Sequence, residues 1–111
     1  MENIKKTSLV NIIGTSFHGD EIYASLNEII TALNIHPNDM DDSKTRFEWR
    51  LEYLANDLYK PIRFTIYDYL HPWTSDKISK IKNTKISWHI GAMSQEDSAM
   101  IKNVIDKLMN K

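Results

Sequence analysis

Polar and apolar residues alternate in three short segments, the spacing that puts polar side chains on one face of a β-strand. Arginine, tyrosine and histidine are among the polar residues. The residues concerned are Arg50 in the first segment, Arg63, Tyr67 and Tyr69 in the second, and His89 in the third. A guanidinium group donates hydrogen bonds to phosphate or carboxylate, and flat rings stack on a base or a sugar. If the three strands are neighbours, the sequence predicts one ligand-binding surface that contains these residues.

An ordinary solvent-exposed sheet face would show the same alternation. Further residues on the predicted polar face are Glu48, Glu52, Thr65 and Ser87. Glutamate and arginine on adjacent strands commonly pair, and threonine and tyrosine are frequent in exposed strands. A solvated face with Glu/Arg pairs is therefore the alternative to a binding surface.

Trp73 lies between His71 and Asp76, in a segment that interrupts the alternation and predicts a loop. A loop tryptophan beside the polar face could close over a ligand or anchor a protein partner. The indole could equally fold back and cover the core. We include Trp73 among the predicted ligand-binding residues and leave both arrangements open.

The sequence contains no spacing typical of a metal site or an active site. The four histidines, His18, His36, His71 and His89, show neither the His-x-x-x-His nor the His-x-x-Glu-His pattern. Asp68 falls on the apolar side of its predicted strand, so we expect its carboxylate to accept backbone or tryptophan N–H bonds. Alternation also sends Asp68 and His89 to opposite faces, which argues against an acid–base pair. We predict a binding protein with no catalytic residue, metal or cofactor.

The composition indicates which cellular compartment and which classes of partner fit the chain. Cysteine is absent, which excludes thiolate catalysis and cysteine-ligated metals and fits a reducing compartment. A formal net charge of -1 gives no strong nucleic-acid signal. The first apolar run is interrupted by Asn11 and Gly14, so it predicts neither a signal peptide nor a membrane span. The expected location is the cytoplasm.

The elements that position these side chains begin with two predicted strands. Residues 8–15 are rich in β-branched side chains, and residues 17–21 supply a turn before a short second strand at residues 22–24. Ser25 and Glu28 then form a capping box, which predicts that a helix begins.

Two amphipathic helices flank three alternating strands in the rest of the chain. The helices are predicted at residues 26–33 and 99–108, and the strands at residues 47–53, 62–69 and 86–90. Ser94 to Asp97 resemble a second capping arrangement before the last helix. The link between the first two of these strands is too short for a crossover and predicts an antiparallel hairpin.

The predicted order is β-β-α-β-β-β-α in one domain of residues 1–111. Only one face of the sheet is apolar, so both helices should cover that face. This predicts an α+β fold with a mainly antiparallel sheet of about five strands. The predicted core contains Ile29, Ile30, Leu33, Trp49, Phe64, Ile66, Trp88, Ile101 and Ile105.

The last helix has an apolar stripe wider than one packing surface requires. Met100 and Met109 add adaptable side chains to it. A homodimer would bury the surplus. The alternative is that both flanks of the stripe fill a single core.

Several short motifs, taken in order and spacing, resemble a family of small phage-encoded proteins. The motifs are Gly14-Thr15-Ser16-Phe17-His18-Gly19, Ala24-Ser25-x-x-Glu28, Glu48-Trp49, Thr65-Ile66-Tyr67-Asp68 and Trp88-His89-Ile90-Gly91. The chain departs from the family pattern where Asn34 and Ala92 replace glycines and where residues 56–60 lack one.

The resemblance implies a phage or prophage source and a role against host defence. Small phage proteins of this kind include sponges that sequester cyclic-nucleotide immune signals and inhibitors of CRISPR effectors. We therefore expect a counter-defence protein that binds a small, cyclic nucleotide in the host cytoplasm. The alternative is a protein–protein inhibitor of a host defence enzyme such as a CRISPR effector, docked through Trp73. An enzyme acting on nucleotides is the third candidate.

Overall fold

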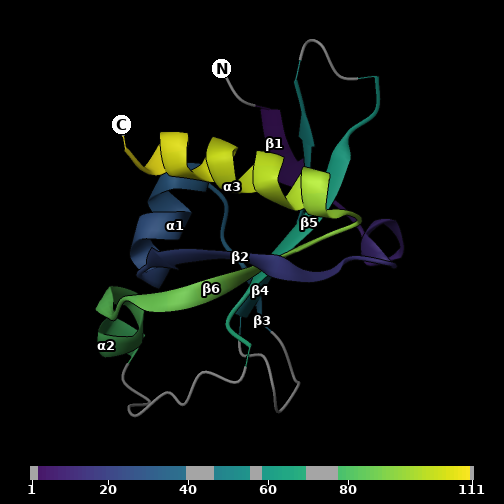
Figure 1. The fold of residues 1–111 in the computed structure, drawn as a ribbon. Helices are drawn as coiled ribbons and strands as arrows, with labels where there is room; N and C mark the ends of the chain where they lie inside the picture. Colours follow the sequence, from purple (N-terminus) through teal and green to yellow (C-terminus); the bar gives the residue numbers. More distant parts are fainter. Residues whose placement is uncertain (1–2, 40–46, 56–58, 70–77, 111) are drawn as a thin grey trace.

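The computed structural model describes residues 3–39, 47–55, 59–69 and 78–110, which form an α+β fold as predicted (Figure 1). The strands are β1 (Asn3–Lys6), β2 (Ser16–Ala24), β3 (Asn38–Asp39), β4 (Phe47–Leu54), β5 (Ile62–Tyr67) and β6 (Ile86–Ala92). The helices are α1 (Leu26–Leu33), α2 (Ile78–Asn83), α3 (Gln95–Met109) and the short 3-10 helix η1 (Val10–Ile12).

One antiparallel sheet carries the candidate residues. Its strands lie in the order β1-β4-β5-β6-β2, and β3 also pairs with β4. The β4–β5 hairpin has the predicted pairing and places Glu48 opposite Tyr67. Tyr67 in turn lies opposite His89 of β6. The three strands on which the predicted surface depends are therefore neighbours.

The core lies between this sheet and the helices α1 and α3 (Figure 1). Trp49 and Trp88 meet edge to face at its centre, with ring centroids 5.5 Å apart. Each buried indole has a hydrogen-bond acceptor, because Nε1 of Trp49 donates to Ile35 O at 2.8 Å and Nε1 of Trp88 donates to Ala24 O at 2.9 Å. The other predicted core residues are also buried, except for a partly buried Ile30: Ile29, Leu33, Phe64, Ile66, Ile101 and Ile105.

Capping residues set the ends of α1. The Ser25 side chain accepts the N–H of Glu28 at 3.1 Å, and Glu28 accepts the N–H of Ser25 at 3.0 Å, which confirms the predicted capping box. The helix ends at Asn34, whose φ of 56° lies in the left-handed region.

Residues 8–15 do not form the predicted strand. They contain η1 instead, while the first strand is β1, which precedes them. Local hydrogen bonds from polar side chains compete with sheet pairing here, since Asn11 Nδ2 donates to Thr7 Oγ1 and Thr15 Oγ1 donates to Ile12 O, both at 2.8 Å. Gly14 adds a φ of 95°, which an extended strand does not allow.

Residues 17–21, predicted as a turn, lie within β2. The strand is irregular between Phe17 and Glu21, where β2 has two residues more than β6. Gly19 takes a φ of 102° in this bulge. The turn-forming residues therefore bend a long strand instead of separating two short ones.

Residues 7–15 cross the face of the sheet that the helices leave open. One row of paired residues runs across five strands: Lys6, Leu51, Phe64, Ala92 and Ser16. The chain leaves this row at Lys6 on one edge and re-enters it at Ser16 on the other, and β4 and β5 extend past the row in both directions. The link must therefore pass over a face. This face is the polar one, because η1 contacts β5 and Thr65, whose side chain lies on the polar face, is buried.

The remaining differences from the sequence prediction concern three elements. The short strand β3 and the helix α2 were not predicted, and α3 begins at Gln95 instead of residue 99. The predicted cap of α3 is confirmed, because the Ser94 side chain accepts the N–H of Asp97 at 3.1 Å. Among the helices in the described ranges, none is long and apolar enough to cross a membrane.

Candidate ligand-binding site

Four rings gather on the polar face of the sheet, and we call Phe17, Tyr67, Tyr69 and His89 the aromatic cluster. Phe17 stacks on His89 with ring centroids 3.9 Å apart and an interplanar angle of 14°. Tyr69 is also close to parallel with His89, at 5.7 Å and 29°. Tyr67 meets His89 edge to face at 5.5 Å. The cluster thus combines a stack of three rings with a fourth ring at its side.

Backbone register explains this stack. Phe17 lies opposite Gly91 on one side of His89, and Tyr69 follows Tyr67, the partner of His89, toward the other side. His89 is therefore the middle ring. Phe17 and Tyr69 are the outer rings, exposed to 41% and 42%.

Gly91 makes room for this arrangement. A Cβ at this position would lie within van der Waals overlap of Thr65 Oγ1 and would also contact the Tyr67 ring. Thr65, only 3% exposed, occupies that space under residues 7–15, which we call the crossing segment. The missing side chain lets Thr65 and Tyr67 lie close to β6.

Two carboxylates border the aromatic cluster. Glu21 lies opposite His89, with Oε1 3.5 Å from His89 Nε2. Glu48 lies opposite Tyr67, and its Oε2 accepts from Arg50 Nε at 2.9 Å. Burial raises the pKa of Tyr67, and the charge of Glu48 and the neighbouring Tyr69 raise it further. These surroundings favour the neutral phenol of Tyr67.

The two predicted arginines lie in different places on the polar face. Arg50 pairs with Glu48 and is next to the aromatic cluster. Arg63 lies four residues before Tyr67 on β5, about 13 Å along the strand. Its Nε is buried and has no hydrogen-bond partner among the described residues. The crossing segment, residues 7–15, passes between these two regions.

The predicted site is thus brought together in part. Tyr67, Tyr69 and His89 are in contact and Arg50 is adjacent, while Arg63 is separate. Trp73 lies outside the described residues.

Sequence reasoning missed Phe17 and Glu21. Both fall in residues predicted as a turn, and the β2 bulge, which brings them beside His89, has no clear sequence signal other than Gly19.

Asp68 has the structural surroundings that its position predicted. It is 2% exposed, and its Oδ1 accepts the backbone N–H of Phe47 at 3.0 Å. In the described part of the chain, no group of three or more histidine and acidic side chains is placed to hold a metal ion.

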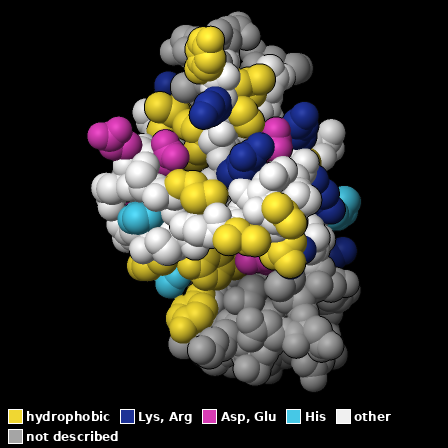
Figure 2. Space-filling view, turned by 90° about the vertical axis from the view of Figure 1, so that its right-hand side faces the viewer, with side chains coloured by type: hydrophobic (Ala, Val, Ile, Leu, Met, Phe, Trp, Pro, Cys, Tyr) yellow, Lys and Arg dark blue, Asp and Glu magenta, His cyan; other side chains and the backbone are white. Residues whose placement is uncertain are grey.

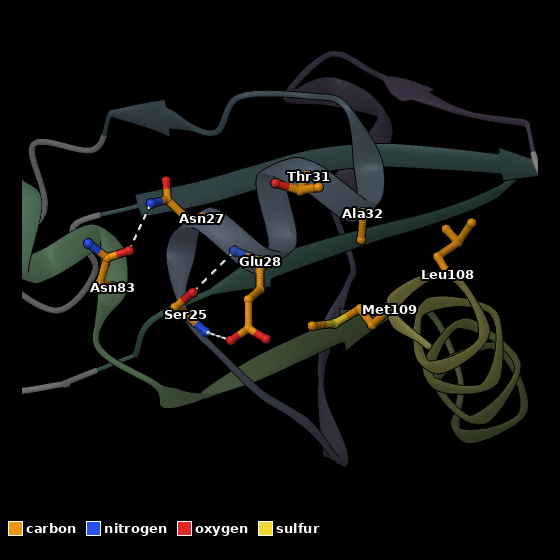
Figure 3. Close-up of a pocket in the computed structure, with 8 residues that line it drawn as sticks. All are labelled: Ser25, Asn27, Glu28, Thr31, Ala32, Asn83, Leu108 and Met109. Carbon is orange, nitrogen blue, oxygen red and sulfur yellow. Dashed lines mark hydrogen bonds between the residues drawn. The ribbon is translucent and has the colours of Figure 1, made fainter. Parts of the chain in front are cut away.

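A hollow lies elsewhere, on the outer surface between α1, α2 and the end of α3 (Figure 3). It has a volume of about 550 Å³, with Ala32, Leu108 and Met109 at its apolar end. Its polar groups bind one another: Asn27 donates to Asn83 at 3.1 Å, and Glu28 is held by the capping box. The hydrogen bond from the Ser25 N–H lowers the pKa of Glu28. We prefer the aromatic cluster as the site because its rings are exposed.

Comparison of the chain with protein families, characterised proteins and solved structures found no match.

Proposed function

We propose that this chain is a binding protein that sequesters a small nucleotide, whose base stacks on the aromatic cluster. The observation that carries the proposal is the stack of Phe17, His89 and Tyr69, which has two partly exposed rings at its ends. Stacking of a base on an aromatic side chain contributes about 1 to 3 kcal/mol. A preorganised stack loses little conformational entropy when a flat ligand joins it.

The proposed biological role is counter-defence of the phage type, in which the captured nucleotide is a cyclic immune signal. This part rests on the resemblance of motifs such as Trp88-His89-Ile90-Gly91 to small phage-encoded proteins. Binding without turnover is the simplest role for the cluster, because Asp68 is engaged on the opposite face of the sheet from His89.

The proposal is tested by incubating the protein with cyclic nucleotides and ADP-ribose derivatives, removing free ligand, denaturing the protein and chromatographing what is released. Recovery of an intact nucleotide is expected. Altered nucleotide would indicate an enzyme, and no retention of any member would overturn the proposal.

A pair of variants locates the binding. Tyr69→Ala removes an outer ring of the stack, whereas Tyr59→Ala removes a fully exposed tyrosine outside the aromatic cluster. We expect Tyr69→Ala to lower the affinity about tenfold or more and Tyr59→Ala to leave it unchanged.

A second candidate function is protein–protein inhibition of a host defence enzyme. Leu9, Val10 and Ile13 of the crossing segment are exposed to 56%, 73% and 69%. Figure 2 faces the side on which η1 lies and shows hydrophobic side chains among basic ones. Apolar side chains held on a hydrogen-bonded turn are typical of protein contacts. If a purified CRISPR effector is inhibited, Val10→Asp should abolish inhibition while the Tyr69→Ala variant retains it.

A further inference from the structure

We infer that the aromatic cluster selects guanine among the nucleotide bases and that Glu21 recognises the hydrogen-bond donors of that base. The inference rests on the proposed function, because it names the base that the stack takes. It depends on three features of the described residues: the position of Glu21 beside the stack, the hydrogen-bonding capacity of its carboxylate oxygens, and the negative charge of that carboxylate.

Glu21 lies beside the middle of the stack. Its strand partner is His89, the ring between Phe17 and Tyr69. Phe17 lies opposite Gly91 and Glu21 opposite His89, two residues apart on β6, so Phe17 and Glu21 are about 7 Å apart along the strand direction. A base that stacks on Phe17 is therefore one side-chain row away from Glu21. A glutamate side chain spans that separation, so the carboxylate can meet the edge of the base.

The carboxylate of Glu21 has acceptor capacity to spare. Its side chain is 43% exposed, and Oε1 is 3.5 Å from His89 Nε2. Oε2 accepts no hydrogen bond from the described residues. Glu48, the other carboxylate, is 16% exposed and bound by Arg50 at 2.9 Å. Glu21 is therefore the acidic side chain available to a ligand.

The chemistry of a free carboxylate favours guanine. An ionised carboxylate only accepts hydrogen bonds, and guanine presents a ring N–H and an exocyclic amino group side by side on one edge. Adenine presents one amino group next to an unprotonated ring nitrogen, whose lone pair a carboxylate repels. The charge of Glu21 also repels a phosphate, so the base and not the phosphate should lie beside this carboxylate.

The test measures the affinities of guanosine, inosine and adenosine monophosphates by calorimetry. Inosine monophosphate lacks the exocyclic amino group, so it should bind more weakly than guanosine monophosphate and better than adenosine monophosphate. We expect a preference of about tenfold or more for guanine over adenine.

Glu21→Gln should abolish this preference, because the amide replaces one acceptor with a donor. The matched control is Glu52→Gln, which removes a carboxylate from the same face of the sheet. Glu52 lies opposite Arg63, on the other side of the crossing segment from the rings, and its Oε2 is 3.8 Å from Lys5 Nζ. This control should keep the preference. Circular dichroism and chemical shifts of Phe17 and His89 would show that both variants are folded and that the ligand contacts the cluster.

The outcomes separate the two proposals. Equal binding of guanosine and adenosine monophosphates, or an unchanged preference in Glu21→Gln, overturns the guanine assignment and leaves nucleotide binding intact. If no mononucleotide and no cyclic nucleotide binds, nucleotide binding itself is overturned.

Discussion

Individual side chains on the two faces of the sheet have different roles. On the core face, Trp49, Trp88 and Asp68 each have a hydrogen-bond partner, so their polar atoms do not disturb the apolar interior. On the polar face, Phe17 and Tyr69 leave ring area exposed next to a carboxylate. This exposed ring area and carboxylate are the groups that the proposed binding function would use.

Asp68→Ala should lower the free energy of unfolding by about 1 to 3 kcal/mol, since the buried N–H of Phe47 would lose its acceptor. Urea denaturation followed by tryptophan fluorescence measures the change. Asp106→Ala is the control, because Asp106 pairs with Lys102 on the surface of α3. A cost for Asp68→Ala no larger than for the control would contradict the assigned role.

Tyr67 should make stability fall at high pH. Its pKa in the folded protein is raised above 10.0, first by burial and then by Glu48 and Tyr69. The unfolded chain therefore releases the phenolic proton before the folded one does, and the stabilising contribution, complete below pH 10, is lost as pH rises through the folded pKa. Thermal melts between pH 9 and about 11 should show a smaller loss for Tyr67→Phe than for the parent. Equal losses would argue against this assignment.

Secondary-structure elements respond to local signals unless a longer-range constraint prevails. The capping box and the left-handed Asn34 fix both ends of α1 as the sequence predicted. The β-branched run at residues 8–15 had an equally strong strand signal, yet it forms η1. The local hydrogen bonds of Asn11 and Thr15 and the positive φ of Gly14 prevent an extended strand there.

Ser25→Ala should destabilise the protein by about 1 kcal/mol, because the N–H of Glu28 loses its side-chain acceptor. Differential scanning calorimetry would show the lower melting temperature. Ser79→Ala in α2, where the serine side chain is exposed, is the matched substitution and should have little effect.

Across the whole molecule, the helices cover one face of the sheet and the crossing segment covers the middle of the other. Phe64 is fully buried in the single core cluster. Phe64→Ala should cost about 3 to 5 kcal/mol in a denaturation experiment. Arg63→Ala, one residue away on the polar face, should cost far less, and a comparable cost for both would mean that the faces are exchanged.

The predicted homodimer stays a prediction. Leu108 and Met109 of α3 pack partly against the core, so Met100, exposed to 42%, remains as the surplus of the stripe. Light scattering at micromolar concentration should give twice the monomer mass of 13.0 kDa. The Met100→Glu variant should give the mass of one monomer. A monomeric parent would remove the dimer.

The sequence by itself determined which side of each strand is apolar, because alternation is a property of the extended backbone and needs no partner. It therefore predicted the core, the β4–β5 hairpin, α1 and the shared face of Tyr67, Tyr69 and His89. Only the tertiary structure decided what lies beside that face. Phe17 and Glu21 reach His89 through a bulge, and residues 7–15 separate Arg63 from the rings. Both features depend on how a segment packs over residues distant in the chain, and such packing has no periodicity for a sequence to display.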